Sequence, residues 1–285
     1  MTYKKRSLKF QFTLKDGKFD EQGNDVLTID NIKAEVEMGA YGGVAGSEMN
    51  ARVYGLSIEK MAQLSYKGRQ FSGPKQNLIK VWADGVPIFY GSIMNCFMDL
   101  NLMPEAPLII QCFATGFEQS LVSAPFSAEG SVDVAEAIQS IAASIDFTVV
   151  NSGVKSKLPG AYFKGDPITQ MRKIAFAAGI NLDVRLGVVY IWPQGGSVDD
   201  TVPFISANNG LIGYPVFSGF GLSITTTFSP LICLGRKIQL ETELPNASGS
   251  YTVISANHYL SSWTEGGPWF TKSYIAPVDL GIIKQ

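Results

Sequence analysis

The sequence predicts a mainly β protein in which a small α+β domain lies between two β blocks. Three observations predict this class. Apolar and polar residues alternate with period two over much of residues 1–125. The apolar spacing becomes helical within residues 126–200, and residues 201–285 return to short alternating runs. We therefore expect a first β domain at 1–125, an α+β domain at 126–200 and a second β domain at 201–285.

The first block contains several short alternating runs. Strands are expected at residues 8–14, 32–38, 49–53 and 107–115, and a short helix over Ser57–Leu64. Asp84-Gly85 lies between two apolar runs and supplies the positive-φ residues that a tight hairpin turn needs. Short strands with polar outer faces favour a small antiparallel barrel or sandwich.

The middle block changes to helical spacing. Val134, Ile138, Ile141 and Ile145 fall on one helical face, with Ser131 as the expected N-cap.

A second helix is expected to follow in the same block. It begins at Asp166-Pro167, where a capping carboxylate precedes a proline at the first helical position, and ends at Gly179. The run after it predicts a hairpin that turns at Leu186-Gly187.

The third block returns to strands and is poor in charge. Strands are expected at 219–228, 237–242, 250–260 and 270–276. Residues 201–235 contain no charged side chain, but repeated proline and glycine residues exclude a membrane-spanning helix there. Because the cores of protein interfaces are depleted in charge, this stretch is a candidate for burial between subunits.

Composition argues against several classes of function. A net charge of -2, from 23 basic and 25 acidic residues, is not that of a nucleic-acid-binding protein. The three cysteines show no paired spacing, which predicts buried free thiols in a reducing cytoplasm. The N-terminus lacks the apolar core of a signal peptide.

No motif predicts catalysis, a metal site or a cofactor. The glycine-rich residues 39–46 lack the following Lys-Ser/Thr of a phosphate loop, so a flexible loop is expected. His258, the single histidine, lies in a predicted strand and is interpreted as structural. Trp192, Trp263 and Trp269 have the chemistry to stack on carbohydrate, but packing in a core or interface is favoured.

A family resemblance begins in the C-terminal block. Its motifs are Ser229-Pro230, Gly235-Arg236-Lys237-Ile238, Gly249-Ser250-Tyr251, His258-Tyr259-Leu260 and Gly266-Gly267-Pro268-Trp269-Phe270-Thr271. Together they resemble the closing segment of baseplate hub proteins of contractile-tailed bacteriophages. Residues 163–184 are similar to the central domain of that family, and the N-terminal strands fit less specifically. The resemblance covers most of the chain and is strongest from about residue 130.

The resemblance implies a structural, non-enzymatic protein with two tube-like antiparallel β-barrel domains flanking the α+β domain. Such a chain forms a homotrimer whose ring joins a hexameric tail tube to a trimeric central spike. The implied partners are the spike protein, the tail tube protein and other baseplate proteins, with DNA only in transit. The implied location is the tail baseplate of the virion, after assembly in the host cytoplasm, with no cofactor and no stable membrane insertion.

Two polar strand faces are candidates for the wall of the DNA channel. Their residues are Lys9, Gln11 and Thr13 on one strand, and Lys33, Glu35 and Glu37 on another. A wall of mixed charge would avoid trapping a polyanion; the alternative is an ordinary solvated outer face.

Two other functions remain open from the sequence. One is a tail-associated peptidoglycan-degrading enzyme that uses carboxylates not recognisable by motif. The other is a carbohydrate-binding β module that uses the three tryptophans named above.

Overall fold

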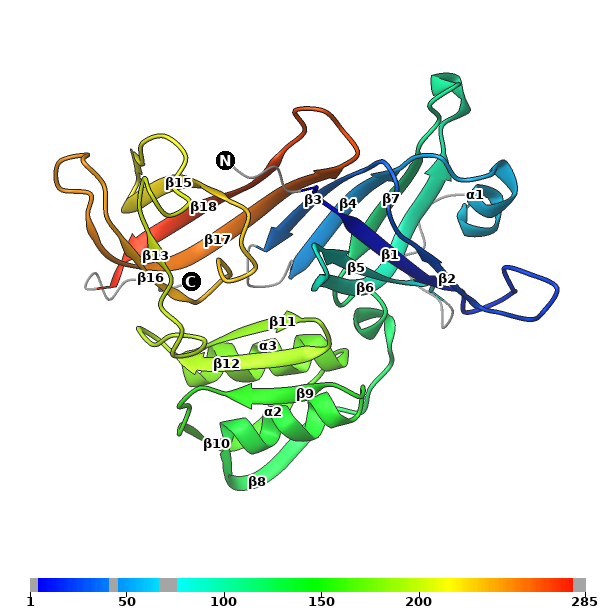
Figure 1. Ribbon diagram of the computed structural model, residues 1–285. Coiled ribbons are helices and arrows are strands. Elements are labelled where there is room, and N and C mark those ends of the chain that lie inside the picture. The colour runs from blue at the N-terminus through cyan, green and yellow to red at the C-terminus, as the bar shows by residue number, and fades with distance from the viewer. Residues whose placement is uncertain (1–4, 41–45, 67–75, 279–285) are drawn as a thin grey trace.

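The computed structural model describes residues 5–40, 46–66 and 76–278. These residues form a 13-stranded sheet, a three-stranded sheet, a two-stranded sheet and three α-helices. In Figure 1 the large sheet spans the upper half of the molecule, and the α+β residues lie beneath it. The protein is therefore mainly β with a small α+β part, as the sequence predicts.

The first block forms most of the large sheet. Its elements are β1 (Leu8–Thr13), β2 (Val26–Ile29), β3 (Ala34–Ala40), β4 (Ser47–Val53), α1 (Ile58–Leu64), β5 (Leu78–Ala83), β6 (Val86–Met98), the 3₁₀ turn η1 (Leu100–Leu102), β7 (Leu108–Phe113) and the 3₁₀ turn η2 (Glu118–Ser120). The expected turn is confirmed, with Asp84 and Gly85 at φ 48° and 83° between β5 and β6. Ser57 caps α1, as its Oγ accepts from Lys60 N at 3.3 Å.

This part of the sheet curls around its own core. Alternate residues of β1 are buried and its other residues are half-buried, which confirms the predicted period of two. Phe10 and Phe12 on β1 share one hydrophobic cluster with Val36 on β3 and Ile110 on β7. In the sheet, β4, β7, β6 and β5 lie between β3 and β1, so the sheet must bend back on itself to bring these residues together.

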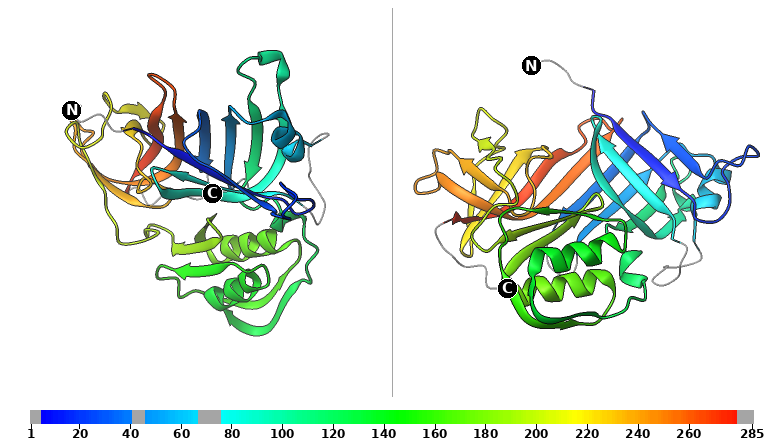
Figure 2. Two further views of the ribbon diagram at one scale, coloured as in Figure 1. Left: turned by 45° about the vertical axis from the view of Figure 1, so that its right-hand side comes forward. Right: turned by 90° about the horizontal axis from the view of Figure 1, so that it is seen from below.

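The middle block is a separate α+β unit with its own core. Its elements are β8 (Phe126–Asp133), α2 (Val134–Ala143), β9 (Thr148–Asn151), β10 (Lys157–Phe163), α3 (Pro167–Ala178), β11 (Ile180–Arg185) and β12 (Val188–Pro193). The helix α2 packs beside α3, against β9, while α3 packs against β11 (Figure 2). The predicted hairpin is confirmed, with Leu186 and Gly187 at φ 54° and 76°.

The helix boundaries show one wrong prediction. Asp166 caps α3, with its carboxylate accepting from Thr169 N at 2.9 Å, and Gly179 ends it at φ 63°, as expected. However, Ser131 is not the N-cap of α2. It lies inside β8 opposite Pro159, and Asp133 caps the helix by accepting from Ala135 N at 2.8 Å. The Asp133 carboxylate also accepts from Glu136 N, so it caps two of the free amides in the first turn of α2.

The third block extends the large sheet. Its strands are β13 (Phe204–Ile205), β14 (Val216–Ser218), β15 (Gly221–Thr227), β16 (Lys237–Leu240), β17 (Gly249–Ser262) and β18 (Trp269–Pro277). Ile224, Ile238, Val253 and Ile275 are among the residues of a third hydrophobic core beneath these strands.

The two β blocks are joined into one sheet, and this corrects the expected pair of closed barrels. One edge of β17 pairs with β16 near its start and with β3 from Ala256 to Ser262, while β18 follows its other edge. Among the described residues the main path of the sheet runs from β14 to β2 and does not close. The expected domain boundaries at 125 and 200 stay a prediction, although Leu260 from the third block lies in the first core.

None of the helices in the described ranges combines the length and the apolar run needed to cross a membrane.

Candidate functional site

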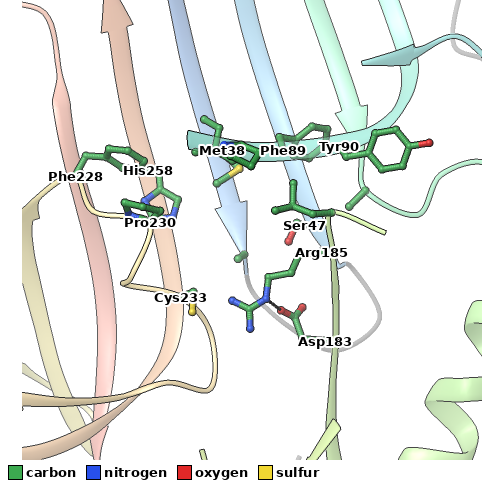
Figure 3. Close-up of a pocket in the computed structure, with 15 residues that line it drawn as sticks. Met38, Ser47, Phe89, Tyr90, Asp183, Arg185, Phe228, Pro230, Cys233 and His258 are labelled. Atoms are coloured by element: carbon green, nitrogen blue, oxygen red, sulfur yellow. Dashed lines mark ion pairs between the residues drawn. The ribbon is translucent and has the colours of Figure 1, made fainter. Parts of the chain in front are cut away.

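A small cavity lies where the three blocks meet. Its walls come from the first block at Met38 and Phe89, from the middle block at Asp183 and Arg185, and from the third block around His258 (Figure 3). The cavity measures about 100 Å³, whereas small-molecule sites are usually about 300–1,000 Å³. We therefore interpret it as a junction between the blocks and not as a substrate site.

An ion pair from β11 lies beside this cavity. Arg185 Nε is 3.2 Å from Asp183 Oδ2, and the Asp183 side chain is almost completely buried. Burial raises the pKa of Asp183, and the charge of Arg185 only partly offsets this. Arg185 also donates to the carbonyl of Leu234 at 3.5 Å. The pair therefore connects the α+β unit to the third block.

His258 has a structural environment, in agreement with its interpretation from the sequence. It is buried on β17, with Nδ1 2.8 Å from Thr271 Oγ1 on β18 and with its ring edge-on to Phe228 at 5.2 Å. Burial lowers the pKa of His258 to about 4. The ring is therefore neutral at pH 7, where it packs against Phe228 and keeps its hydrogen bond to Thr271.

This burial predicts a loss of stability in mild acid. The unfolded chain takes up a proton near the ordinary histidine pKa of about 6.5, but the folded chain does so only near 4. The contribution of neutral His258 to the free energy of unfolding is therefore complete above about pH 6.5. It is lost as the pH falls toward 4, and the total loss is about 3 kcal/mol. Urea unfolding of the native chain and of His258→Gln at pH 7 and pH 4 measures it. Equal losses in both proteins would contradict the prediction.

The candidate channel residues lie on two separate faces. On β1, Lys9 Nζ lies 5.1 Å from the Trp82 ring centroid and Gln11 donates to Thr28 Oγ1 at 3.3 Å, while Thr13 is half-buried beside them. The apolar residues of both β1 and β3 point into one core. The polar faces of β1 and β3 therefore point away from that core on different sides of the curled sheet, and one chain does not bring them together.

The β3 face is a mixed-charge surface. Lys33 Nζ lies 2.6 Å from Glu105 Oε2, and this hydrogen bond raises the pKa of Lys33. Glu35 pairs with Arg52 on β4 at 3.6 Å, and Glu37 is exposed. The face continues onto the third block, because β3 pairs with β17. It thus spans the seam between the two β blocks.

The charge-free stretch carries the densest exposed apolar surface of the third block. Phe217 on β14 is 60% exposed and Phe220, in the turn to β15, is 80% exposed. The other large exposed apolar residues between 202 and 231 are Val202, Phe204, Ile212, Tyr214, Val216 and Leu231. Because β14 is one end of the sheet path, this apolar surface borders an open sheet edge.

The tryptophans, cysteines and glycine-rich loop singled out in the sequence form no common site among the described residues. Trp192 is buried, Trp269 is half-buried against the first core and Trp263 is exposed, so the tryptophans do not share one surface. Cys96 and Cys112 are buried as expected, but Cys233 is only half-buried. The centre of the glycine-rich loop, residues 41–45, falls outside the described residues. Within those residues, no three His, Cys, Asp or Glu side chains converge to hold a metal.

The sequence analysis missed two groups of residues. One is the Asp183–Arg185 pair, whose signal was two charges in an otherwise apolar hairpin. The other is the apolar tip between β6 and β7, where Leu100, Leu102 and Met103 are exposed. Its signal was a run of large apolar residues at a position where a turn is expected to be polar.

Comparison with solved structures gives matches along nearly the whole chain. The tail protein of Neisseria meningitidis matches with a TM-score of 0.64 and 10% identity, over 95% of this chain and 96% of that one. The 43 kDa tail protein of prophage MuSo2 from Shewanella oneidensis matches with a TM-score of 0.64 and 9% identity, over 96% of this chain and 98% of that one. The chain shares the fold of these tail proteins.

A third structure with this tail-protein fold is the prophage tail protein gp18 of Listeria monocytogenes, with a TM-score of 0.51 and 7% identity over 95% of both chains. No protein-family model and no curated protein matches the sequence. The likeness supports the coarser part of the resemblance seen in the sequence, the fold of a phage tail protein.

Proposed function

We propose that the chain is a structural, non-enzymatic hub subunit of a contractile phage tail. In this proposal three copies form a ring in the tail baseplate of the virion, after assembly in the host cytoplasm. The ring joins the hexameric tail tube to the trimeric central spike. The observation that carries the proposal is the tail-protein fold along at least 95% of the chain.

The large sheet supports a role in a ring. It is a continuous wall in which both β blocks lie side by side (Figure 1). Among the described residues β14 forms one end of its main path. Open edges and exposed apolar surface are usually covered in a finished assembly. The stretch 202–231 borders this edge and is free of charge, so a neighbouring copy can cover it without desolvating an ion. We assign it to the contact between subunits.

The β3 face suits the channel wall better than the β1 face. Glu35 and Glu37 lie on β3, and Lys33 directly precedes this strand, where the sheet runs without a break across both β blocks. Two of these three charges already have partners of opposite sign, Glu105 and Arg52. Passing DNA would therefore meet little unpaired positive charge, so that few counterions would be released and DNA would not be retained.

The oligomeric state tests the proposal. Light scattering on the purified chain is expected to give a mass three times 30.9 kDa. Phe217→Ser with Phe220→Ser is expected to weaken the trimer at least about tenfold, because burial of one such side chain contributes about 1.5–3 kcal/mol.

The matched control is Phe176→Ser. Phe176 is 78% exposed on α3, outside the charge-free stretch 202–231, and its replacement should leave the mass unchanged. A chain that stays monomeric at every concentration, even after addition of the spike protein, would contradict the proposal.

A further inference from the structure

An exposed turn in the charge-free stretch leads into the only Asn-Gly pair of the sequence, Asn209-Gly210. The turn, residues 206–209, directly follows β13. Asn209 N and Leu211 N both donate to the carbonyl of Ser206, each at 2.9 Å. Asn209 is exposed, so its side-chain amide is in contact with solvent water.

Two features leave the backbone nitrogen of Gly210 free to attack the Asn209 side chain. Glycine has no Cβ to obstruct the approach, and Gly210 has a φ of +86°, which residues with a side chain rarely adopt. In addition, no oxygen among the described residues accepts a hydrogen bond from Gly210 N, whereas Gly210 O accepts from Thr227 N at 2.7 Å. The nucleophile is therefore unpaired although the turn around it is held in place.

We propose that Asn209-Gly210 is a site of spontaneous modification, at which the asparagine becomes aspartate or isoaspartate. The Gly210 nitrogen gives up its proton and bonds to Cγ of Asn209, which closes a cyclic imide and releases the side-chain nitrogen as ammonia. Water then opens the imide. Cleavage of the bond from nitrogen to Cγ gives aspartate, and cleavage of the bond to the backbone carbonyl carbon gives isoaspartate. The net reaction exchanges the amide for a carboxylate with water as the co-reactant.

The product does not fit the turn as asparagine does. Asn209 Nδ2 donates to the carbonyl of Phe204. A carboxylate at pH 7 has no proton to donate there, so two oxygens would face each other. In isoaspartate the backbone also continues through the side chain and gains an atom. This atom lengthens the chain between the bonds at Ser206 and Thr227, which the present turn spans.

The modification also changes the surface that the proposed function assigns to the contact between subunits. Phe204 and Ile212, on either side of the turn, are 44% and 45% exposed, and their stretch carries no charge. A carboxylate at position 209 would be its first charge, and covering it would cost desolvation free energy. We therefore expect unassembled chains to lose the ability to form the trimer as Asn209 converts. This consequence rests on the proposed function, whereas the modification itself does not.

Ageing of the purified chain tests the proposal. The chain is kept dilute, so that no neighbouring copy covers the turn, and at pH 8, because base favours the attacking nitrogen. Peptide mapping by mass spectrometry, with isoaspartate detected by enzymatic methylation, is expected to place the conversion at Asn209. Asn208 in the same turn should stay unchanged, because the residue after it has a side chain. The aged chain is expected to form the trimer at least about tenfold more weakly than the fresh chain in light scattering.

Two glutamine variants in the same turn provide matched controls. Asn209→Gln keeps a neutral amide, but its longer side chain would have to close a larger and less favourable ring. This variant is expected to keep its trimer affinity on ageing. Asn208→Gln removes the other asparagine of the turn and should age as the native chain does. Gly210→Ala is unsuitable, because its Cβ would lie 2.8 Å from Thr227 Oγ1 at a φ of +86°.

The outcomes separate the two proposals. An aged native chain that keeps asparagine at position 209 would show that the modification site is wrong. A chain that converts but forms the trimer as tightly as before would confirm the modification and overturn its effect on the subunit contact. If the fresh native chain forms no trimer, even with the spike protein, the hub function is wrong, and the peptide map still decides whether Asn209 converts.

Discussion

Replacing Gly235 with alanine is expected to lower the free energy of unfolding by about 3–4 kcal/mol. A Cβ at this position would lie 2.3 Å from Cζ2 of the buried Trp192 and 2.8 Å from its Cε2. The backbone is fixed there, because Gly235 N donates to Val253 O and Gly235 O accepts from Val198 N, both at 2.9 Å. Its φ of +78° adds the strain of a left-handed alanine. Urea unfolding at a fixed protein concentration measures the change.

Gly130→Ala separates the clash from the backbone strain. Gly130 has nearly the same φ, +77°, but a Cβ there meets no atom within 4 Å. This variant should therefore lose only the left-handed strain, about 1–2 kcal/mol. Equal losses at the two sites would show that contact with Trp192 is not what requires glycine at position 235.

Replacing Arg185 with methionine is expected to cost about 3–5 kcal/mol at neutral pH. The change removes the charge next to the Asp183 carboxylate, which is then buried without its partner. Because burial already raises the pKa of Asp183, removal of Arg185 raises it further. The folded state then binds the proton more readily than the unfolded state, so the deficit should shrink as the pH falls. Unfolding at pH 8 and pH 5 measures this trend.

The double variant Asp183→Val with Arg185→Met serves as the control. It replaces both charges by apolar side chains suited to a buried strand, and such exchanges are often neutral for stability. Most of the lost stability should therefore return. A double variant as unstable as Arg185→Met alone would show that the loss comes from the packing of Arg185 or its bond to Leu234 and not from an unpaired carboxylate.

Local features of the fold were predictable from local sequence. The alternation that starts at Leu8 became β1, Asp84-Gly85 formed the hairpin turn, and Asp166-Pro167 and Gly179 bounded α3. Each of these depends on residues within a few positions of one another. The prediction of Ser131 as the N-cap of α2 was wrong because local sequence offers two capping side chains, Ser131 and Asp133, close together. Only the pairing of β8 with β10, which is not local, excludes Ser131.

Pairings over long distances in the sequence were not predictable. Nothing around His258 shows that it lies opposite Met38, and this pairing is what turns two expected barrels into one sheet. The arrangement of the candidate channel residues was not predictable for the same reason. The alternation on β1 and β3 correctly gave their polar faces, but the curl of the sheet, which directs those faces to different sides, arises from a shared core.

The pairing of β3 with β17 has a consequence for synthesis of the chain. The hydroxyl of Ser262 donates to the carbonyl of Ile32 across 230 positions of sequence, so this edge of β3 lacks its native partner until β17 has left the ribosome. Domains usually fold from the N-terminus as they emerge, but here the first block keeps an open edge during translation. Only chains that have been synthesised as far as Ser262 can form the full pairing of β3 with β17. A nascent chain that stops before β17 therefore keeps the β3 edge unpaired, and such an edge can pair with another chain.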